Sequence, residues 1–260
     1  MIKKKLAIVG IVGVPANYGG FETLVEYLLD LLPKFYDITI YCQSQSYPEK
    51  VDTYKGAKLE YLNLKANGVQ SVIYDSVSLW KSIKGFDYIL ILGVSGAITI
   101  PFIKPFTRAK VITHIDGLEW KRDKWGAFAK RFLKFSESIA VKYSDAIISD
   151  NKHIYDYVQE EYGKDSHLIA YGANHVTNVD PALYQKKYSF IHNPYIFTVC
   201  RIEPENNIEM QLKVFSDNDL KIPYVIVGNW TMECACIRNI LPRRMLFFTI
   251  LFTPVKNLMF

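Results

Sequence analysis

The sequence predicts an α/β fold, with one complete doubly wound domain followed by the start of a second one. Short apolar stretches alternate with amphipathic helical stretches over residues 1–173. The same alternation resumes at residue 195, after a polar stretch at 174–194. Strands that alternate with helices in this way favour a parallel sheet covered on both faces. A chain of 260 residues is long enough for two such domains.

Hydrophobic periodicity gives the expected elements of the first domain. Continuous apolar runs such as DYILIL are typical of strands that are buried on both faces. We expect strands at 6–12, 37–42, 57–64, 87–92, 110–115, 145–149 and 167–171. Helices show apolar residues three or four positions apart, as Leu24, Leu28 and Leu31 do. We expect helices at 21–32, 69–83, 125–143 and 152–162.

The second domain begins after a linker at 174–194. Residues 195–230 contain a strand at 195–200, a helix at 208–215 and a strand at 223–227. The last stretch, 231–260, shows no strand–helix alternation and carries four Lys or Arg residues against Glu233. We therefore interpret it as an atypical tail, out of frame or cut short after about Trp230. Two strands and one helix cannot cover a sheet, so we expect the tail to be disordered or loosely packed and the chain to aggregate.

Composition excludes several classes of protein. Four cysteines do not form a disulfide framework, which favours a reducing compartment. The basic start MIKKK leads into an apolar run without a small-residue cleavage site, so we interpret it as a first strand. No stretch reaches the roughly 18 apolar residues of a membrane span. A net charge of +5 is too small to indicate a nucleic-acid partner.

A glycine-rich turn joins the first strand to the first helix. The stretch GVPANYGGFETL places Gly19 and Gly20 at the start of that helix, where free N–H groups and the helix dipole favour phosphate. The G-x-G-x-x-G spacing of dinucleotide-binding folds and the Gly-Lys-Ser/Thr of a P-loop are both missing. A tight turn without a ligand explains the two glycines about equally well.

The stretch THIDGLEWKRDKW follows a predicted strand. His114, Asp116 and Glu119 therefore lie near the carboxyl edge of the sheet, where α/β folds bind ligands. Three ionisable groups beside a glycine favour a catalytic site, although single residues of these types are more often structural. Asp217-Asn218-Asp219 is read as a turn, and Cys234-x-Cys236 lacks a second ligand pair, so no metal site is predicted.

The segment after this motif is both basic and aromatic. Trp125, Phe128, Phe132 and Phe135 share one helical stripe, which we expect to pack into the first domain. The cations around it are candidates for contact with an anionic membrane surface: Lys121, Arg122, Lys130, Arg131 and Lys134. A second apolar and basic loop, IPFIKPFTRAK, could reach the same surface.

Several longer motifs occur in a fixed order: GVPANYGGFETLVEYL, HIDGLEWKRDKWG, SDAIISDNKHIYDYV, LIAYGAN and FTVCRIEPENNIEM. Through them the first 230 residues or so resemble the rhamnosyltransferase type of retaining glycosyltransferase family four. The resemblance implies a GT-B architecture, with a complete N-terminal Rossmann-like domain and the start of a C-terminal nucleotide-sugar-binding domain. It also implies hexosyl transfer, of rhamnose in this type, from a nucleotide-sugar donor to a lipid-linked glycan acceptor in capsule or O-antigen synthesis. The protein would be cytoplasmic and peripheral to the inner face of the membrane.

The resemblance also implies roles for single residues. Gly19 and Gly20 would contact the donor diphosphate from one side and Arg201 from the other, with no metal ion or other cofactor. His114 and Asp116 would orient the sugar or the acceptor. Glu205-Asn206-Asn207 stand where many relatives carry a lysine, and the glutamate-containing stretch that holds the donor ribose is missing after VIVGNW. We therefore expect little activity from the chain alone. The alternative is a non-catalytic acceptor-binding module that pairs with a separate C-terminal chain.

Overall fold

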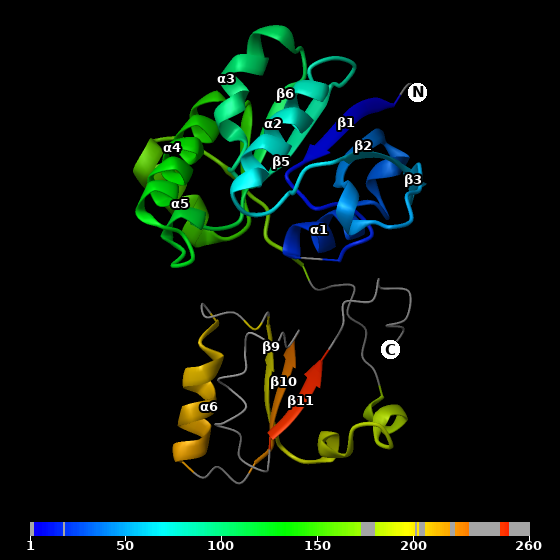
Figure 1. The fold of residues 1–260 in the computed structure, drawn as a ribbon, viewed down its shortest axis with the longest axis vertical. Helices are drawn as coiled ribbons and strands as arrows, with labels where there is room; N and C mark the ends of the chain where they lie inside the picture. The colour runs from blue at the N-terminus through cyan, green and yellow to red at the C-terminus, as the bar shows by residue number, and fades with distance from the viewer. Residues whose placement is uncertain are drawn as a thin grey trace. The chain divides into compact units, whose positions relative to one another are not determined.

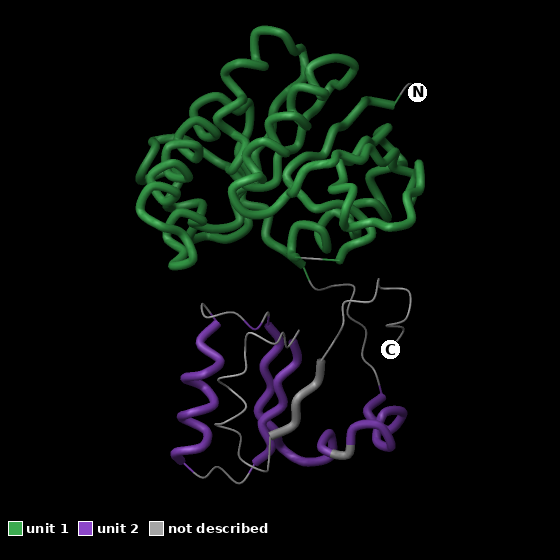
Figure 2. Tube along the Cα trace, in the orientation of Figure 1, with its two compact units in different colours: residues 1–172 green, residues 173–260 purple. Residues whose placement is uncertain are grey.

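The computed structural model of the chain describes residues 3–17, 19–172, 180–200, 202, 206–218, 222–228 and 245–249. The chain divides into two compact units, Met1–Gly172 and Ala173–Phe260, which Figure 2 colours separately. Each unit is described by itself.

Unit 1 is built on one eight-stranded sheet with the order β3-β4-β2-β1-β5-β6-β7-β8 (Figure 1). Its strands are β1 (Lys4–Val9), β2 (Tyr36–Gln43), β3 (Thr53–Tyr54), β4 (Ala57–Leu62), β5 (Tyr88–Leu92), β6 (Lys110–Ile115), β7 (Ala146–Ser149) and β8 (His167–Leu168). All neighbouring strands run parallel except β3 and β4. Because β2 and β5 flank β1, the strand order reverses there, and this is where doubly wound folds bind ligands.

Helices cover both faces of this sheet. They are α1 (Gly20–Leu28), α2 (Ser71–Lys81), α3 (Ile100–Ile103), α4 (Ala127–Tyr143) and α5 (Lys152–Tyr162). Alternate side chains of β1 point to opposite faces: Ala7 and Val9 pack with buried residues of α2 to α5, whereas Leu6 and Ile8 pack with α1. The sheet is therefore the middle layer of three, and its carboxyl edge is left to the loops.

The expected positions of most of these elements are confirmed. The helix at 152–162 begins and ends as expected, and the strand at 110–115 also has the expected bounds. The first helix ends at Leu28 rather than residue 32, because the chain turns into a short 3₁₀ helix, Leu32–Lys34, with Pro33 in its first turn. The short β3 and α3 were not expected.

The described residues of unit 2 form a three-stranded parallel sheet with the order β11-β10-β9, one α-helix and two short 3₁₀ helices. The elements are β9 (Ile196–Val199), α6 (Ile208–Asp217), β10 (Tyr224–Gly228) and β11 (Met245–Thr249). Apolar residues of α6, among them Leu212 and Phe215, pack on Tyr224 and Ile226. Within the stretch expected to be the linker, residues 181–184 and 189–192 form two short 3₁₀ helices.

The expectation that residues 231–260 lack regular structure is wrong for residues 245–249. They form β11, whose Met245 pairs with Tyr224 and whose Thr249 pairs with Gly228. The sequence MLFFT is rich in residues with high strand propensity, and the backbone of β10 offers an open edge for pairing. The rest of the tail, and Trp230 before it, lie outside the described residues.

Candidate active site

The loop between β1 and α1 crosses the carboxyl edge of the sheet of unit 1. At Gly10 the backbone has φ +95°, and a Cβ there would lie 2.2 Å from the carbonyl oxygen of Leu92 at the end of β5. Only glycine fits such a close crossing. Further along the loop, the Tyr74 hydroxyl donates to the Ile11 carbonyl at 3.0 Å, and the Tyr47 hydroxyl donates to the Pro15 carbonyl at 3.0 Å.

Two buried glutamates of α1 fix the conformation of this loop by accepting hydrogen bonds from its backbone amides. Glu22 accepts hydrogen bonds from the Val12 amide at 2.8 Å and the Gly19 amide at 3.0 Å. Glu26 accepts from the Ala16 amide at 2.9 Å and from the Tyr54 hydroxyl. Sequence analysis missed both residues. A signal was present for Glu22, because it stands three residues after Gly19, the residue that caps the helix, which is the glutamate spacing of a capping box.

The two predicted phosphate-contacting glycines therefore differ. The Gly19 amide is already used by Glu22, so it is a loop contact rather than an open donor. Gly20 is exposed, and a Cβ built on it would meet nothing within 4 Å. Open space above the first residue of α1 leaves room for a ligand at the helix N-terminus.

His114 is the last residue but one of β6 and contacts Phe21 of this helix. Its side chain is 4% exposed, and its ring lies 5.3 Å from the ring of Phe21 on α1 and 5.8 Å from the ring of Tyr171 after β8. Burial lowers the pKa of His114 to about 4, so the imidazole is neutral near pH 7. No described residue makes a hydrogen bond to its Nε2 atom. A buried polar atom without a partner is costly unless a ligand or water satisfies it.

Asp116 lies two residues further, at the open side of the edge. The carboxylate reaches solvent, but surrounding protein atoms desolvate it in part and raise its pKa to about 6, and the negative charge of Asp150 after β7 adds to this. Desolvation also raises the pKa of Asp150. Burial raises the pKa of Tyr171, and the charges of Asp116 and Asp150 contribute. Asp150 and Tyr171 were not predicted as site residues; only the fold brings them to Asp116.

The carboxylate of Glu119, the third predicted catalytic residue, interacts with side chains of its own loop. Its Oε2 accepts from Arg122 at 3.0 Å, and its Oε1 accepts from the Trp125 indole at 3.0 Å and pairs with Lys124 at 3.0 Å. Partial burial opposes ionisation, but these donors lower the pKa of Glu119 overall. Glu119 is thus placed to hold the loop after β6.

The stripe of aromatic residues on α4 does not face the core as expected. Phe128 is 86% exposed and Phe135 is 54% exposed. The buried face of α4 instead carries Leu133, Ser136, Glu137, Ala140 and Val141. Residues seven apart in a helix share a face, so Phe128 and Phe135 lie together on the side opposite the buried residues.

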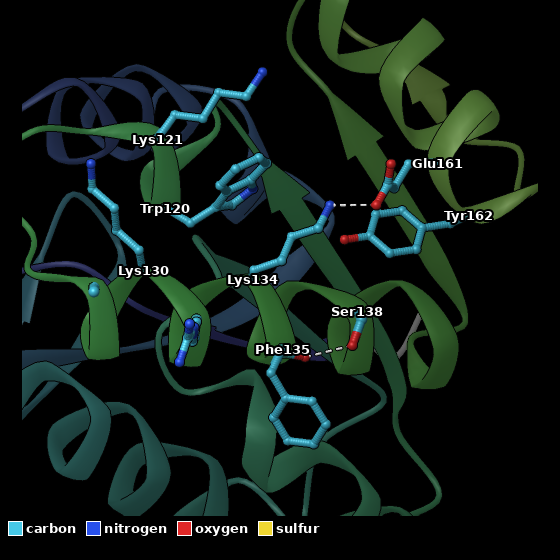
Figure 3. Close-up of a pocket in the computed structure, with 10 residues that line it drawn as sticks. Trp120, Lys121, Lys130, Lys134, Phe135, Ser138, Glu161 and Tyr162 are labelled. Carbon is cyan, nitrogen blue, oxygen red and sulfur yellow. Dashed lines mark hydrogen bonds and ion pairs between the residues drawn. The ribbon is translucent and has the colours of Figure 1, made fainter.

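The five predicted membrane-facing cations have different surroundings. Arg122 pairs with Glu119, and Lys130 pairs with the fully exposed Asp123 at 3.5 Å. Lys134 pairs with Glu161 at 2.8 Å and lies near the rings of Trp120 and Tyr162 (Figure 3). Its ammonium group also lies over the ring of Tyr157. Lys121 and Arg131 are exposed. Arg201, the predicted cation of unit 2, lies outside the described residues.

Within the described ranges, no group of three or more His, Cys, Asp or Glu side chains is arranged to hold a metal ion. No helix in that part of the chain is long and apolar enough to cross a bilayer.

Comparisons with solved structures show the fold. Sucrose-phosphate synthase from Thermosynechococcus elongatus superposes with a TM-score of 0.74 at 13% identity, over 95% of this chain and 70% of that chain. HepE from Anabaena in complex with UDP and glucose gives 0.63 at 10% identity, over 95% and 69%. UDP-N-acetylglucosamine 2-epimerase from Rickettsia bellii gives 0.58 at 11% identity, over 95% and 69%. The chain has a partial GT-B fold, with a Rossmann-like first domain and part of a second.

Sequence comparison identifies the family. No curated protein matches the chain. Residues 3–174 match the model of the family described as Domain of unknown function (DUF1972). This match covers all of unit 1, from the first strand to the last, and therefore includes the glycine-rich loop, His114 and Asp116. The chain belongs to the DUF1972 family.

Proposed function

We propose that the protein is a glycosyltransferase that moves a sugar from a nucleotide-sugar donor to an acceptor hydroxyl. One observation carries the proposal: the buried, unpartnered Nε2 of His114 lies at the ligand-binding edge of a GT-B domain, two residues before a carboxylate with a raised pKa. The similarity to sucrose-phosphate synthase and to HepE supports it at the level of the fold.

In this proposal each residue of the edge has a separate task. The neutral His114 makes a hydrogen bond to a sugar hydroxyl, which satisfies its Nε2 atom. Asp116 orients the acceptor or the donor sugar. The open N-terminus of α1 at Gly20 stabilises the negative charge that grows on the leaving diphosphate, and Arg201 adds a charged hydrogen bond.

The bond changes follow those of a retaining transfer. The acceptor oxygen forms a bond to the anomeric carbon while the bond from that carbon to the diphosphate oxygen breaks. The leaving phosphate takes the proton of the acceptor hydroxyl. No pair of glycosidase-type carboxylates is then required.

The finer assignment follows the sequence resemblance. We assign rhamnose as the sugar and a lipid-linked glycan as the acceptor, in capsule or O-antigen synthesis at the inner face of the cytoplasmic membrane. The exposed aromatic and basic face of α4 supports a peripheral place at the membrane surface.

A transfer assay tests the proposal. The full chain is incubated with a panel of labelled nucleotide-sugars and a bacterial lipid extract, and the label is followed into the lipid fraction and into free sugar. Label in the lipid fraction with equimolar nucleoside diphosphate supports a transferase. An altered nucleotide-sugar without transfer would indicate an epimerase, and label in neither fraction would contradict the proposed activity for this chain.

A further inference from the structure

A cavity of about 820 Å³ lies on the outer side of α4, between the loop after β6 and the end of α5 (Figure 3). Trp120 and Lys121 line it from the loop, and Glu161 and Tyr162 line it from α5. Lys130, Arg131, Lys134 and Phe135 line it from α4. It is separate from the edge that holds His114.

Cations outnumber carboxylates in the lining of this cavity. Four cationic side chains line it against one carboxylate, that of Glu161. Lys134 is shared between Glu161, at 2.8 Å, and the buried Glu137, at 3.7 Å. The pair of Lys130 with Asp123 is weak, because Asp123 is fully exposed to water. Among the described residues, no carboxylate pairs with Lys121 or Arg131, so Lys121, Lys130 and Arg131 are available to an anion.

The aromatic lining is not arranged to stack on a sugar ring. Lys121 and Lys134 hold their ammonium groups over the ring of Trp120, at 5.3 and 4.8 Å from its centroid. The ring face is therefore in use by cations. The Trp120 indole N–H is buried, and no described residue accepts a hydrogen bond from it. An anion with several oxygen atoms would accept a hydrogen bond from this indole N–H and would also pair with the cations beside it.

Apolar side chains border the cavity on the solvent side. Phe135 lines it, and Phe128 lies two turns earlier on the same exposed face of α4. Cations next to exposed aromatic rings match the interface of a bilayer, where phosphate groups lie directly above the acyl chains. Binding of a soluble phosphate would not explain why the rings of Phe128 and Phe135 are exposed.

The cavity is also within reach of the proposed reaction site. Trp120 follows Asp116 by four residues, so their Cα atoms are at most about 14 Å apart along the chain. A lipid held by its phosphate in the cavity could thus present a sugar attached to that phosphate near Asp116.

The geometry points to this cavity as a binding site for the phosphate group of a membrane lipid, with Lys121, Lys130 and Arg131 as its charged ligands and Phe128 and Phe135 on the acyl chains. The assignment rests on the proposed function only for the identity of the natural lipid. Binding to vesicles needs no nucleotide-sugar, so it is measured independently of transfer.

Sedimentation with lipid vesicles tests the site with the full chain. One set of vesicles contains phosphatidic acid, whose charged group is a phosphate. The other set contains a fatty acid, whose charged group is a carboxylate. Both sets have the same surface charge. The test variant is Lys121→Gln/Lys130→Gln/Arg131→Gln, and the matched control is Lys34→Gln/Lys65→Gln/Lys84→Gln, which removes the same charge from other exposed positions. Circular dichroism checks that both fold.

We expect wild type and control to bind phosphatidic acid vesicles at least about tenfold more strongly than the test variant does, and more strongly than they bind carboxylate vesicles. We also expect Trp120→Phe, which removes the orphan N–H and leaves a smaller aromatic ring under the ammonium groups of Lys121 and Lys134, to weaken this preference. Equal losses in test and control variants, or equal binding to both vesicle types, would overturn the site. If the protein binds inorganic phosphate but no vesicles, the site takes a soluble phosphate, and the proposal of a membrane lipid would be overturned.

Discussion

Gly10 has no room for a side chain, whereas Gly20 at the start of α1 does. A Cβ at Gly10 would strike the Leu92 carbonyl at a φ of +95°, whereas a Cβ at Gly20 would meet open space. Gly10→Ala should therefore destabilise unit 1 by about 3 kcal/mol or more. Gly20→Val should leave stability within about 1 kcal/mol of wild type, yet weaken donor binding at least about tenfold by blocking the helix N-terminus. Urea unfolding and calorimetric titration of the donor measure the two effects. Full donor affinity in Gly20→Val would remove Gly20 from the site.

A buried carboxylate gives unit 1 a pH dependence. Asp75 on α2 accepts hydrogen bonds from the Ser95 hydroxyl and the Gly96 amide, and burial raises its pKa from 3.8 to about 7. The folded state thus binds the proton more tightly than the unfolded state does. Stability from this group is complete below about pH 4 and is lost as the pH rises to about 7.

Asp75→Asn should flatten this decline. At about 1.4 kcal/mol for each pH unit, the loss in wild type is at most about 4 kcal/mol. Urea midpoints measured from pH 4 to pH 8 in both proteins give the comparison. A wild type and a variant with parallel profiles would show that Asp75 does not cause the decline.

At the scale of elements, sequence patterns predict a helix well when both of its ends carry local signals. For α5, the Asn151 side chain accepts from the Ile154 amide at 3.0 Å, and Gly163 adopts a left-handed conformation with φ +61°. Both signals are readable in the sequence. For α4 the aromatic stripe was recognised but assigned to the wrong face, because the buried face consists of smaller and polar residues whose partners are distant in sequence.

The contacts of α4 with α5 depend on Lys134 in particular. The Tyr157 and Tyr162 hydroxyls donate to the buried Glu137, and the Lys134 ammonium lies 3.7 Å from the same carboxylate. Lys134→Ala should cost about 1–3 kcal/mol, since it removes a cation from a buried acid and from three rings. Lys130→Ala should cost less than about 0.5 kcal/mol, because its partner is exposed. Thermal unfolding of both variants compares them; equal melting temperatures would contradict this difference.

At the scale of the whole molecule, the candidate site was predictable only in part. His114 lies near the end of the strand predicted at 110–115 and Asp116 directly follows it, so their place at the carboxyl edge could be derived from the sequence. Asp150, Tyr171 and the support from Glu22 and Glu26 could not, because each depends on tertiary neighbours. In unit 2, β11 was missed because residues 224 and 245, which pair in the sheet, are far apart in sequence.

Limited proteolysis tests the division into units. Unit 1 contains a full three-layer core, so we propose that it resists cleavage as one body. Cuts should fall within 174–194 or after residue 230 and should leave a fragment of about the size of residues 1–172. Early cuts inside β1 to β7, seen by mass spectrometry, would show that the first unit is not an independent domain.

The most direct test of the central claim is the transfer rate of His114→Ala at saturating donor. The claim is that the buried imidazole binds the reacting sugar, so its removal should lower the transfer rate about 100-fold or more, as the loss of a preorganised hydrogen bond does. The substitution also removes a buried ring that packs on Phe21 and Tyr171, so the unfolding midpoint should fall, and transfer is compared under conditions where both proteins are folded. A folded His114→Ala protein that transfers sugar at the wild-type rate would contradict the account.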